Sequence, residues 1–432
     1  MEIKRDYYLN KLINKKENGL IKVITGIRRC GKSYLLFNLY DKYLIDNGIK
    51  ESHIIKLALD DDQNIEYRNP IILSQYVRSK IKDKKMYYVF LDEIQKVESI
   101  QNPHIPNKES YITFVDTLVG LMKIPNLDIY VTGSNSKMLS SDILTEFRDR
   151  GDEIKVNPLS YKEVCEYYGQ SGYSIWQQYI TYGGMPLAVA KKTHEEKSSY
   201  LKDLFTRTYL LDVLERHNIK HNSDVLQDLL NIISSSIGSL TNARKLSNTF
   251  KTEKNKVVSV NAINRYLEYF EDAFLISKAE RYDIKGKKYI SSPVKYYFCD
   301  VGLRNARLNF RQQEETHIME NIIYNELKMR DFDIDVGIVE YNTKNSENKS
   351  IRKQLEVDFI ATKGSKKYYI QSALHIDEEA KREQETASLK RIEDSFKKII
   401  IVKDDIIPYH DEQGILYISV QDFLLKDEAI DW

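Results

Sequence analysis

The sequence predicts an α/β protein whose N-terminal part is a parallel sheet with helices on both faces. In that part, apolar segments with strand character alternate with segments of helical apolar spacing, and this alternation is typical of a parallel sheet. We expect strands at residues 20–25, 54–59, 86–91, 127–132 and 153–156. A Gly-x-x-x-x-Gly-Lys-Ser motif at residues 26–33 follows the first strand and precedes a helical segment, which is the position of a phosphate-binding loop.

The length and composition indicate a globular protein of several domains. A chain of 432 residues is too long for one compact core, so two or three domains are expected. Charged residues make up 30%, but the formal net charge is only +1, which gives no argument for a nucleic-acid partner. No apolar run reaches the ~18–20 residues of a membrane span, and the first residues lack a signal-peptide core. The three cysteines form neither a disulfide framework nor a metal-ligand spacing, so we expect a cytoplasmic protein without a membrane partner.

The motif at residues 26–33 has the features that bind the phosphates of a nucleotide. Its glycines let the backbone curl so that N–H groups point at phosphate oxygens, and the following helix adds its positive dipole end. Lys32 is expected to reach the β- and γ-phosphates, and Ser33 to ligate Mg²⁺. The expected ATP-binding residues are Gly26, Ile27, Arg28, Arg29, Cys30, Gly31, Lys32, Ser33 and Tyr34.

Two acidic residues at the end of the third predicted strand complete a nucleotide-hydrolysis site. Asp92 is expected to hold Mg²⁺, and Glu93 to orient or deprotonate the attacking water. The fourth strand runs into a polar turn at the same edge of the sheet, where Ser134 or Asn135 could place a hydroxyl or an amide beside the γ-phosphate. An exposed acidic strand end and an ordinary turn are the alternatives.

Arginines and a cysteine near this site have open roles. Arg148 or Arg150 could stabilise transition-state charge, from the same or a neighbouring subunit, or could belong to a solvated charge run. Arg28 and Arg29 occupy variable positions of the loop and are expected to face solvent or a partner domain. The thiol of Cys30 is expected either to face the nucleotide and react with alkylating reagents, or to fill a small-residue position.

Several short segments together carry a family resemblance. These segments are residues 20–33, 91–95, 132–139, 157–163, 182–186 and 292–304. Their order resembles a family of prokaryotic AAA-type P-loop ATPases of largely unknown cellular role, and the resemblance covers essentially the whole chain. The phosphate loop is common to many families, whereas the segments 182–186 and 292–304 are specific to this one. The resemblance implies ATP binding, hydrolysis, a winged-helix-like segment and a C-terminal domain similar to restriction endonucleases.

The expected domain order combines the sequence pattern with this resemblance. We expect a P-loop AAA-type ATPase domain at residues 1–157, a helical region at 158–222, a winged-helix-like region at 223–312 and a degenerate nuclease-like domain at 313–432. Within the winged-helix-like region, the polar face of a predicted helix carries Asn261, Asn264, Arg265 and Glu268. A recognition helix presents such a face to a DNA groove, but this face is only weakly basic, so a plain packing role stays open.

The C-terminal domain has an incomplete form of a metal-dependent nuclease site. In the arrangement that it resembles, a helix Glu, an Asp and an (Asp/Glu)-x-Lys pair gather a divalent ion and position the attacking water. By this resemblance, Glu326 and Asp358 match carboxylate positions and Gln371 replaces the second acidic ligand. Ala373 stands where the lysine is required, which argues against DNA cleavage and for a binding or packing domain.

The sequence as a whole predicts a Mg²⁺-dependent ATPase that couples its nucleotide state to the rearrangement of its domains or of a partner. ATP, ADP and Mg²⁺ are the expected ligands, an unidentified protein or DNA is the expected partner, and an oligomer is left open. One alternative is a slowly hydrolysing nucleotide switch that scaffolds a partner. Another is an ATP-dependent DNA-processing nuclease, which Ala373 disfavours.

Overall fold

The chain divides into two compact units. The computed structural model describes residues 3–105, 110–134, 151–217, 219, 223–312, 314–344 and 348–432. Unit 1 comprises Met1–Pro158 with Asp272–Phe274, and unit 2 comprises Leu159–Glu271 with Leu275–Trp432. Within the described ranges, no helix is long and apolar enough to cross a lipid bilayer.

Unit 1 is built on a five-stranded sheet in the order β2-β3-β6-β1-β7, with every pairing parallel. The strands are β1 (Ile21–Thr25), β2 (Ile54–Ala58), β3 (Tyr87–Asp92), β6 (Leu127–Thr132) and β7 (Gly151–Lys155). A short hairpin adds β4 (Ile100–Gln101) and β5 (Tyr111–Ile112). The helices are α1 (Asp6–Asn14), α2 (Lys32–Tyr34), α3 (Asp41–Asp46), α4 (Pro70–Lys80) and α5 (Phe114–Met122). The predicted parallel sheet is therefore confirmed.

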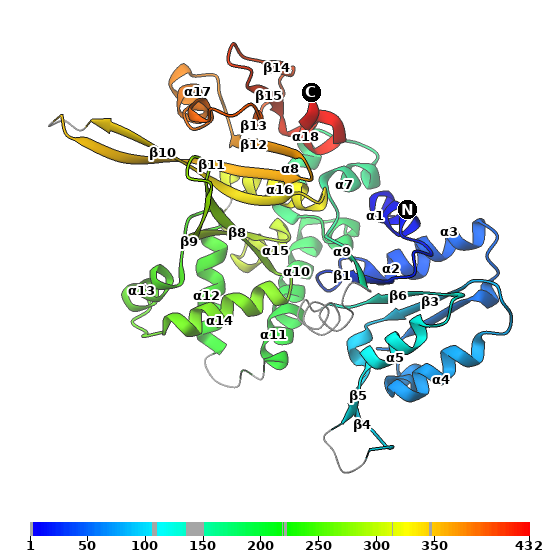
Figure 1. Ribbon diagram of the computed structural model, residues 1–432. Coiled ribbons are helices and arrows are strands. Elements are labelled where there is room, and N and C mark those ends of the chain that lie inside the picture. The colour runs from blue at the N-terminus through cyan, green and yellow to red at the C-terminus, as the bar shows by residue number, and fades with distance from the viewer. Residues whose placement is uncertain are drawn as a thin grey trace. The chain divides into compact units, whose positions relative to one another are not determined.

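Helices cover both faces of this sheet. Apolar side chains of α4 and α5 pack on β1, β3 and β6 in one buried cluster. On the opposite face, the π-helical segment Leu35–Tyr40 between α2 and α3 contacts the sheet through aromatic rings. Phe37 meets Phe90 edge-on at 6.1 Å, and the rings of Tyr40 and Tyr130 lie 5.0 Å apart. Figure 1 shows α4 and α5 on one side of the sheet and α1–α3 on the other.

The strand order places a topological switch point beside β1. After β1 the chain crosses to β2 at the far edge of the sheet, whereas after β6 it continues to β7 on the other side of β1. Ligands of open α/β sheets bind at the carboxyl ends of the strands where the connections diverge in this way. The loop that follows β1 and the turn that follows β6 both begin at this crevice.

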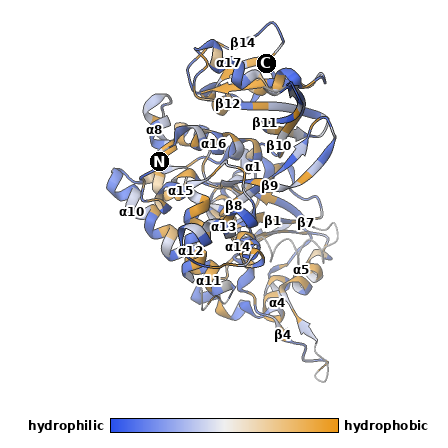
Figure 2. Ribbon diagram, turned by 90° about the vertical axis from the view of Figure 1, so that its left-hand side faces the viewer, coloured by the Kyte–Doolittle hydropathy of each residue, from blue (hydrophilic) through white to orange (hydrophobic). Residues whose placement is uncertain are grey.

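Unit 2 begins with a series of helices. They are α7 (Tyr161–Tyr168), α8 (Tyr173–Tyr182), α9 (Pro186–Ala190), α10 (His194–Leu204), α11 (Leu211–Arg216), α12 (Ser223–Ser235), α13 (Ala243–Glu253) and α14 (Val260–Asp272). Capping boxes start two of them, because Ser160 and Thr193 each bond reciprocally with a glutamate three residues later. The amphipathic helix α12 carries both orange and blue residues in Figure 2, since one face is buried and the other is not.

An eight-stranded mixed sheet forms the rest of unit 2, in the order β14-β15-β13-β12-β11-β10-β8-β9. Its strands are β8 (Ile276–Asp283), β9 (Lys288–Phe298), β10 (Asp333–Lys344), β11 (Ser350–Lys363), β12 (Lys366–Ala373), β13 (Lys397–Val402), β14 (Tyr409–His410) and β15 (Leu416–Ser419). The remaining helices are α15 (Val301–Arg307), α16 (Glu315–Met329), α17 (Glu379–Thr386) and α18 (Val420–Leu425).

The hairpin that follows α14 is part of this sheet. β8 pairs with β9 in antiparallel fashion, and it also pairs in parallel with β10, where Arg281 lies opposite Val336. The predicted boundary between residues 312 and 313 therefore separates strands of one sheet. The winged-helix and restriction-endonuclease-like identities of these parts, and the finer domain limits, stay predictions.

Candidate functional site

The loop after β1 is shaped by two glycines. Gly26 has φ +139°, and a Cβ on it would lie 2.1 Å from the carbonyl oxygen of Val156, so no larger residue fits. Gly31 has φ +101° and stands directly before the first residue of α2. Both angles lie in the region that glycine adopts without steric cost. The chain can therefore turn sharply from the strand into the helix, as a phosphate loop requires.

Lys32 is buried against this loop. Its Nζ donates to the carbonyl oxygens of Gly26 at 2.9 Å and Ile27 at 3.1 Å. Only 4% of the residue is exposed. The ammonium group is thus held at the backbone segment whose N–H groups the motif assigns to nucleotide phosphates.

A row of oxygen ligands lies beside Lys32. The hydroxyl of Ser33 donates to Oδ1 of Asp92 at 2.9 Å, and the hydroxyl of Thr132 donates to the same atom. Burial raises the pKa of Asp92, while the hydrogen bonds from Thr132 and Ser33 lower it. Hydroxyl and carboxylate oxygens are the ligands that Mg²⁺ prefers, so the donor set of Ser33 and Asp92 fits the predicted ion.

Glu93 is held in an unusual backbone conformation next to Asp92. Its φ of +53° and ψ of +51° are left-handed, which is uncommon for a residue other than glycine. Its N–H donates to the hydroxyl of Thr132 at 3.0 Å. Its carboxylate accepts a hydrogen bond from the side-chain amide of Gln95 and another, at 3.4 Å, from the hydroxyl of Ser134. Strand ends β3 and β6 thus bring the predicted pair Glu93 and Ser134 together.

The remaining loop residues differ in exposure. Arg29 is exposed, whereas the half-buried Arg28 donates from Nε to the hydroxyl of Ser134 at 3.4 Å. Ile27 is buried and Tyr34 is half-buried. Three predicted residues, Asn135, Arg148 and Arg150, lie outside the described residues.

The side chain of Cys30 does not take the position expected for a thiol that faces a nucleotide. The residue has no exposed surface, and its thiol donates to the carbonyl oxygen of Val156 at 3.3 Å. Of the two roles expected for Cys30, its buried side chain fits that of a small residue that fills a packed position. Its backbone still belongs to the loop.

Buried Arg5 stabilises the loop through hydrogen bonds to backbone carbonyl groups. Its guanidinium donates to the carbonyl oxygen of Cys30 at 2.9 Å and to that of Asn157 at 2.7 Å. Sequence reasoning missed this arginine because it stands 25 residues before Cys30, just ahead of α1. Thr132 and Gln95 were missed as well, although each neighbours a residue that the strand-end pattern singles out.

The predicted nuclease-like residues do not all meet in unit 2. Asp358 and Gln371 are neighbours, since the N–H of Asp358 donates to Oε1 of Gln371 at 3.4 Å. Glu326 instead accepts from Nε of Arg330 at 2.7 Å. Burial raises the pKa of Glu326 and the charge of Arg330 opposes that rise. Glu326 thus forms a local ion pair on α16, where the resemblance implied a carboxylate beside Asp358.

A buried lysine occupies the centre of the carboxylate cluster that the structure does form. Nζ of Lys295 lies 2.8 Å from Glu320, 2.7 Å from Glu356 and 3.8 Å from Asp358. Burial lowers the pKa of Lys295, but the three carboxylates more than offset this effect, so that the pKa is raised overall. Burial, with the charge of Glu320, raises the pKa of Asp358 to about 8. Sequence reasoning missed Lys295, Glu320 and Glu356.

Comparison with known proteins agrees with the geometry of unit 1. Residues 18–165 match the family of AAA domains, and residues 173–314 match a domain of unknown function (DUF8612). An uncharacterized protein of Haemophilus influenzae is 32% identical over 434 residues, which cover 98% of this chain and 99% of that protein. The chain belongs to this family of AAA-domain proteins. A second relative, the uncharacterized protein MJ1544 of Methanocaldococcus jannaschii, is 30% identical to this chain. The match covers 97% of this chain and 88% of the relative.

Two solved structures resemble this AAA-domain protein at low sequence identity. The Walker-type ATPase PABY2304 of Pyrococcus abyssi is 14% identical, with coverage of 71% of this chain and 96% of that chain and a TM-score of 0.46. AMPPCP-bound DnaA from Aquifex aeolicus is also 14% identical, with coverage of 61% and 85% and a TM-score of 0.32. The P-loop fold of unit 1 is therefore assigned from the AAA-domain match and from its own strand order and loop.

Proposed function

We propose that this protein binds ATP with Mg²⁺ and hydrolyses it at the crevice between β1, β3 and β6. The observation that carries the proposal is the hydrogen bond from Ser33 to Asp92, which joins the phosphate loop to the acidic strand end. Lys32 directly precedes Ser33 and Glu93 directly follows Asp92, so this contact joins a phosphate ligand, metal ligands and a candidate base in one site. We further propose that the nucleotide state is coupled to the rearrangement of domains or of a bound partner.

The residues of the site have separate roles in this proposal. Lys32 neutralises the β- and γ-phosphates, and Ser33 and Asp92 hold the metal ion. Bound Mg²⁺ would supply charge stabilisation at the phosphate oxygens. Glu93 orients the attacking water and accepts its proton, and Ser134 keeps the carboxylate in position. Arg148 or Arg150 is proposed to stabilise the transition state, in the same subunit or in a neighbouring one.

Phosphate release by the full chain, combined with calorimetry of nucleotide binding, tests the proposal. Lys32→Ala should lose ATP affinity. Glu93→Gln should keep ATP bound while turnover falls by roughly 10²–10⁴-fold. Glu98→Gln is the matched control, because Glu98 is exposed on the same loop and should leave both quantities unchanged. Unchanged affinity and turnover in Lys32→Ala would overturn the proposal.

A slowly hydrolysing switch is the second candidate, and one contact favours it. The amide of Gln95 donates to the carboxylate of Glu93 and thereby competes with a water molecule for the candidate base. If this contact limits the rate, Gln95→Ala should speed single-turnover hydrolysis. Faster hydrolysis in that variant supports the switch, and a rate equal to or below that of the parent supports the steadily working ATPase.

For the eight-stranded domain we propose a binding or packing role without DNA cleavage. Ala373 carries no ammonium group, and Lys295 already pairs with the carboxylates around Asp358. The test is nicking of supercoiled plasmid with Mg²⁺ or Mn²⁺. Metal-dependent nicking by the parent that Asp358→Ala abolishes would contradict this proposal and favour a nuclease.

A further inference from the structure

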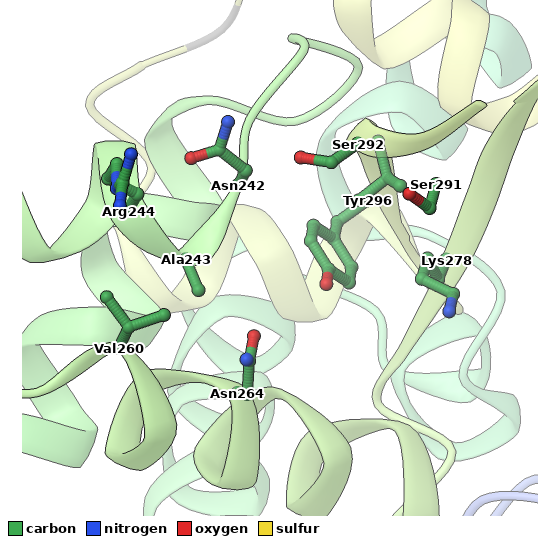
Figure 3. A pocket seen from close by; sticks show the side chains of 10 residues that line it. Asn242, Ala243, Arg244, Val260, Asn264, Lys278, Ser291, Ser292 and Tyr296 are labelled. Carbon is green, nitrogen blue, oxygen red and sulfur yellow. The ribbon is translucent and has the colours of Figure 1, made fainter.

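A polar cavity of about 500 Å³ opens in unit 2 between the start of α13, the start of α14 and the hairpin β8–β9. Helix α13 contributes Asn242 and Arg244, α14 contributes Asn264, and the strands contribute Lys278, Ser292 and Tyr296 (Figure 3). Two cationic side chains and several hydroxyl and amide groups therefore face one space. None of the described residues that line it is acidic.

The hydroxyl of Tyr296 is the most informative group in this cavity. Tyr296 is only 7% exposed, and its hydroxyl makes no hydrogen bond to any residue in the described part of the chain. Figure 3 shows its ring crossing the cavity, with the oxygen directed toward Asn264. The ring of Tyr296 is largely buried, while its hydroxyl faces the open cavity, where solvent or a ligand can satisfy it. Tyr296 therefore offers a donor to whatever enters the cavity.

The start of α13 adds further donors. The side chain of Asn242 caps the helix by accepting the N–H of Lys245 at 2.8 Å. The N–H groups of the first turn and the positive end of the dipole of this 11-residue helix favour a negative charge near the cavity. Arg244 extends from the same turn and is exposed. A guanidinium, a helix start and a hydroxyl together form a donor set suited to phosphate oxygens.

Two carboxylates of α14, Glu268 and Glu271, add negative charge near Tyr296. Burial, and then the charges of Glu271 and Glu268, raise the pKa of Tyr296, so its hydroxyl stays protonated and can donate at neutral pH. Lys278 pairs with Glu280 at 2.9 Å. The neighbouring glutamates weaken the attraction for an anion, so Arg244 has to supply much of it.

We propose that this cavity binds a phosphate group of a duplex DNA backbone. Because Arg244, Asn264 and Ser292 are exposed, a phosphate that belongs to a long polymer can enter from the surface. The exposed polar residues Asn261 and Arg265 lie on the same helix, α14, as the lining residue Asn264. The contact positions the duplex without reading its sequence. It does not depend on ATP hydrolysis.

Fluorescence anisotropy of the full chain with a labelled duplex tests the site. Tyr296→Phe removes only the hydroxyl, and Arg244→Gln removes only the charge. Each should weaken binding roughly tenfold, and Arg244→Gln should also reduce the slope of log K against log salt by about 1. Glu268→Gln should strengthen binding by roughly two- to threefold, because it removes a repulsive charge.

Two matched variants control for general effects. Tyr289→Phe removes a hydroxyl of the same hairpin that donates to Asp335, and Lys245→Gln removes a charge of α13 that lies outside the cavity lining. Both should keep at least half of the parent affinity. Equal losses in the controls and the cavity variants would overturn the site, as would the absence of DNA binding by the parent. Calorimetric binding of inorganic phosphate by a parent protein that binds no DNA would show a free-phosphate site and overturn the DNA assignment.

Discussion

The carboxylate of Asp300 accepts a hydrogen bond from the backbone N–H of Gly184 at 2.6 Å, although 116 residues separate them. The same carboxylate caps α15 by accepting the N–H of Leu303 at 2.9 Å. Asp300 thus joins the segment 182–186, between α8 and α9, to the start of α15. The resemblance implied that these two segments are characteristic of the family, and Asp300 gives them one buried structural contact inside unit 2.

Gly183→Ala should strongly destabilise unit 2. Gly183 has φ +65°, and a Cβ on it would lie 2.3 Å from the carboxylate oxygens of Asp300. We expect a loss of about 3 kcal/mol or more in the free energy of unfolding, as strain and overpacking combine. Gly169→Ala is the control: Gly169 has φ +67° but nothing within 4 Å of a Cβ, so only about 1–2 kcal/mol should be lost. Urea denaturation measures both, and equal losses would show that the contact with Asp300 is unimportant.

Asp300→Asn should change how stability depends on pH. Burial raises the pKa of Asp300 from 3.8 to about 6, against the opposing effect of three backbone N–H groups. Because the folded state favours the protonated form, this stabilisation is complete below pH 3.8 and is lost as the pH rises through about 6. From pH 4 to 7, the parent should therefore lose up to about 3 kcal/mol relative to Asp300→Asn. A constant difference between the two unfolding curves would contradict the shift.

Lys295→Met should destabilise the eight-stranded sheet. The substitution leaves Glu320, which is 7% exposed at its side chain, without its cation, and breaking a buried ion pair in this way costs about 3–5 kcal/mol. Lys366→Met removes an exposed lysine that pairs with Asp431, and it should cost at most about 1 kcal/mol. Thermal unfolding of both variants at neutral pH provides the comparison. A Lys295→Met protein as stable as the control would show that the carboxylates are not held together by this lysine.

Cys30 should react slowly with alkylating reagents in the native protein. It has no exposed surface, whereas Cys299 is partly exposed. Peptide mapping after brief treatment with iodoacetamide should show modification at Cys299 before Cys30, with or without Mg-ATP. Rapid labelling of Cys30 that Mg-ATP blocks would mean that the loop opens to present its thiol to the nucleotide.

The sequence singles out the loop and the acidic strand end of the candidate nucleotide site because their signals are local. The loop 26–33 is recognised by glycines that adopt positive φ angles. Asp92 is recognised because it ends an apolar strand. The left-handed conformation of Glu93 has no such signal, and its N–H donates to Thr132 of another strand. Spatial neighbours from distant segments decide these details.

The carboxylate cluster around Lys295 contains Glu320 of α16, whereas the sequence spacing singled out Glu326 of the same helix, which pairs with Arg330. Glu320 and Glu326 both lie on α16, and at 100° per residue they point about 120° apart around the helix axis. Which one faces Asp358 depends on how the helix packs on the sheet, and the sequence pattern does not contain that packing. Lys295 comes from β9, before α16, so no motif centred on residues 326–373 could include it.

The parallel pairing of β8 with β10 links the order of synthesis to folding. β8 leaves the ribosome about 50 residues before the strand that covers its edge, a delay of a few seconds at 5–20 residues per second. During that interval its backbone N–H and C=O groups are open to pairing with other chains. Expression of a fragment that stops at residue 312 would make the exposed edge permanent. Such fragments should aggregate, whereas in the whole of unit 2 the edge of β8 is paired with β10.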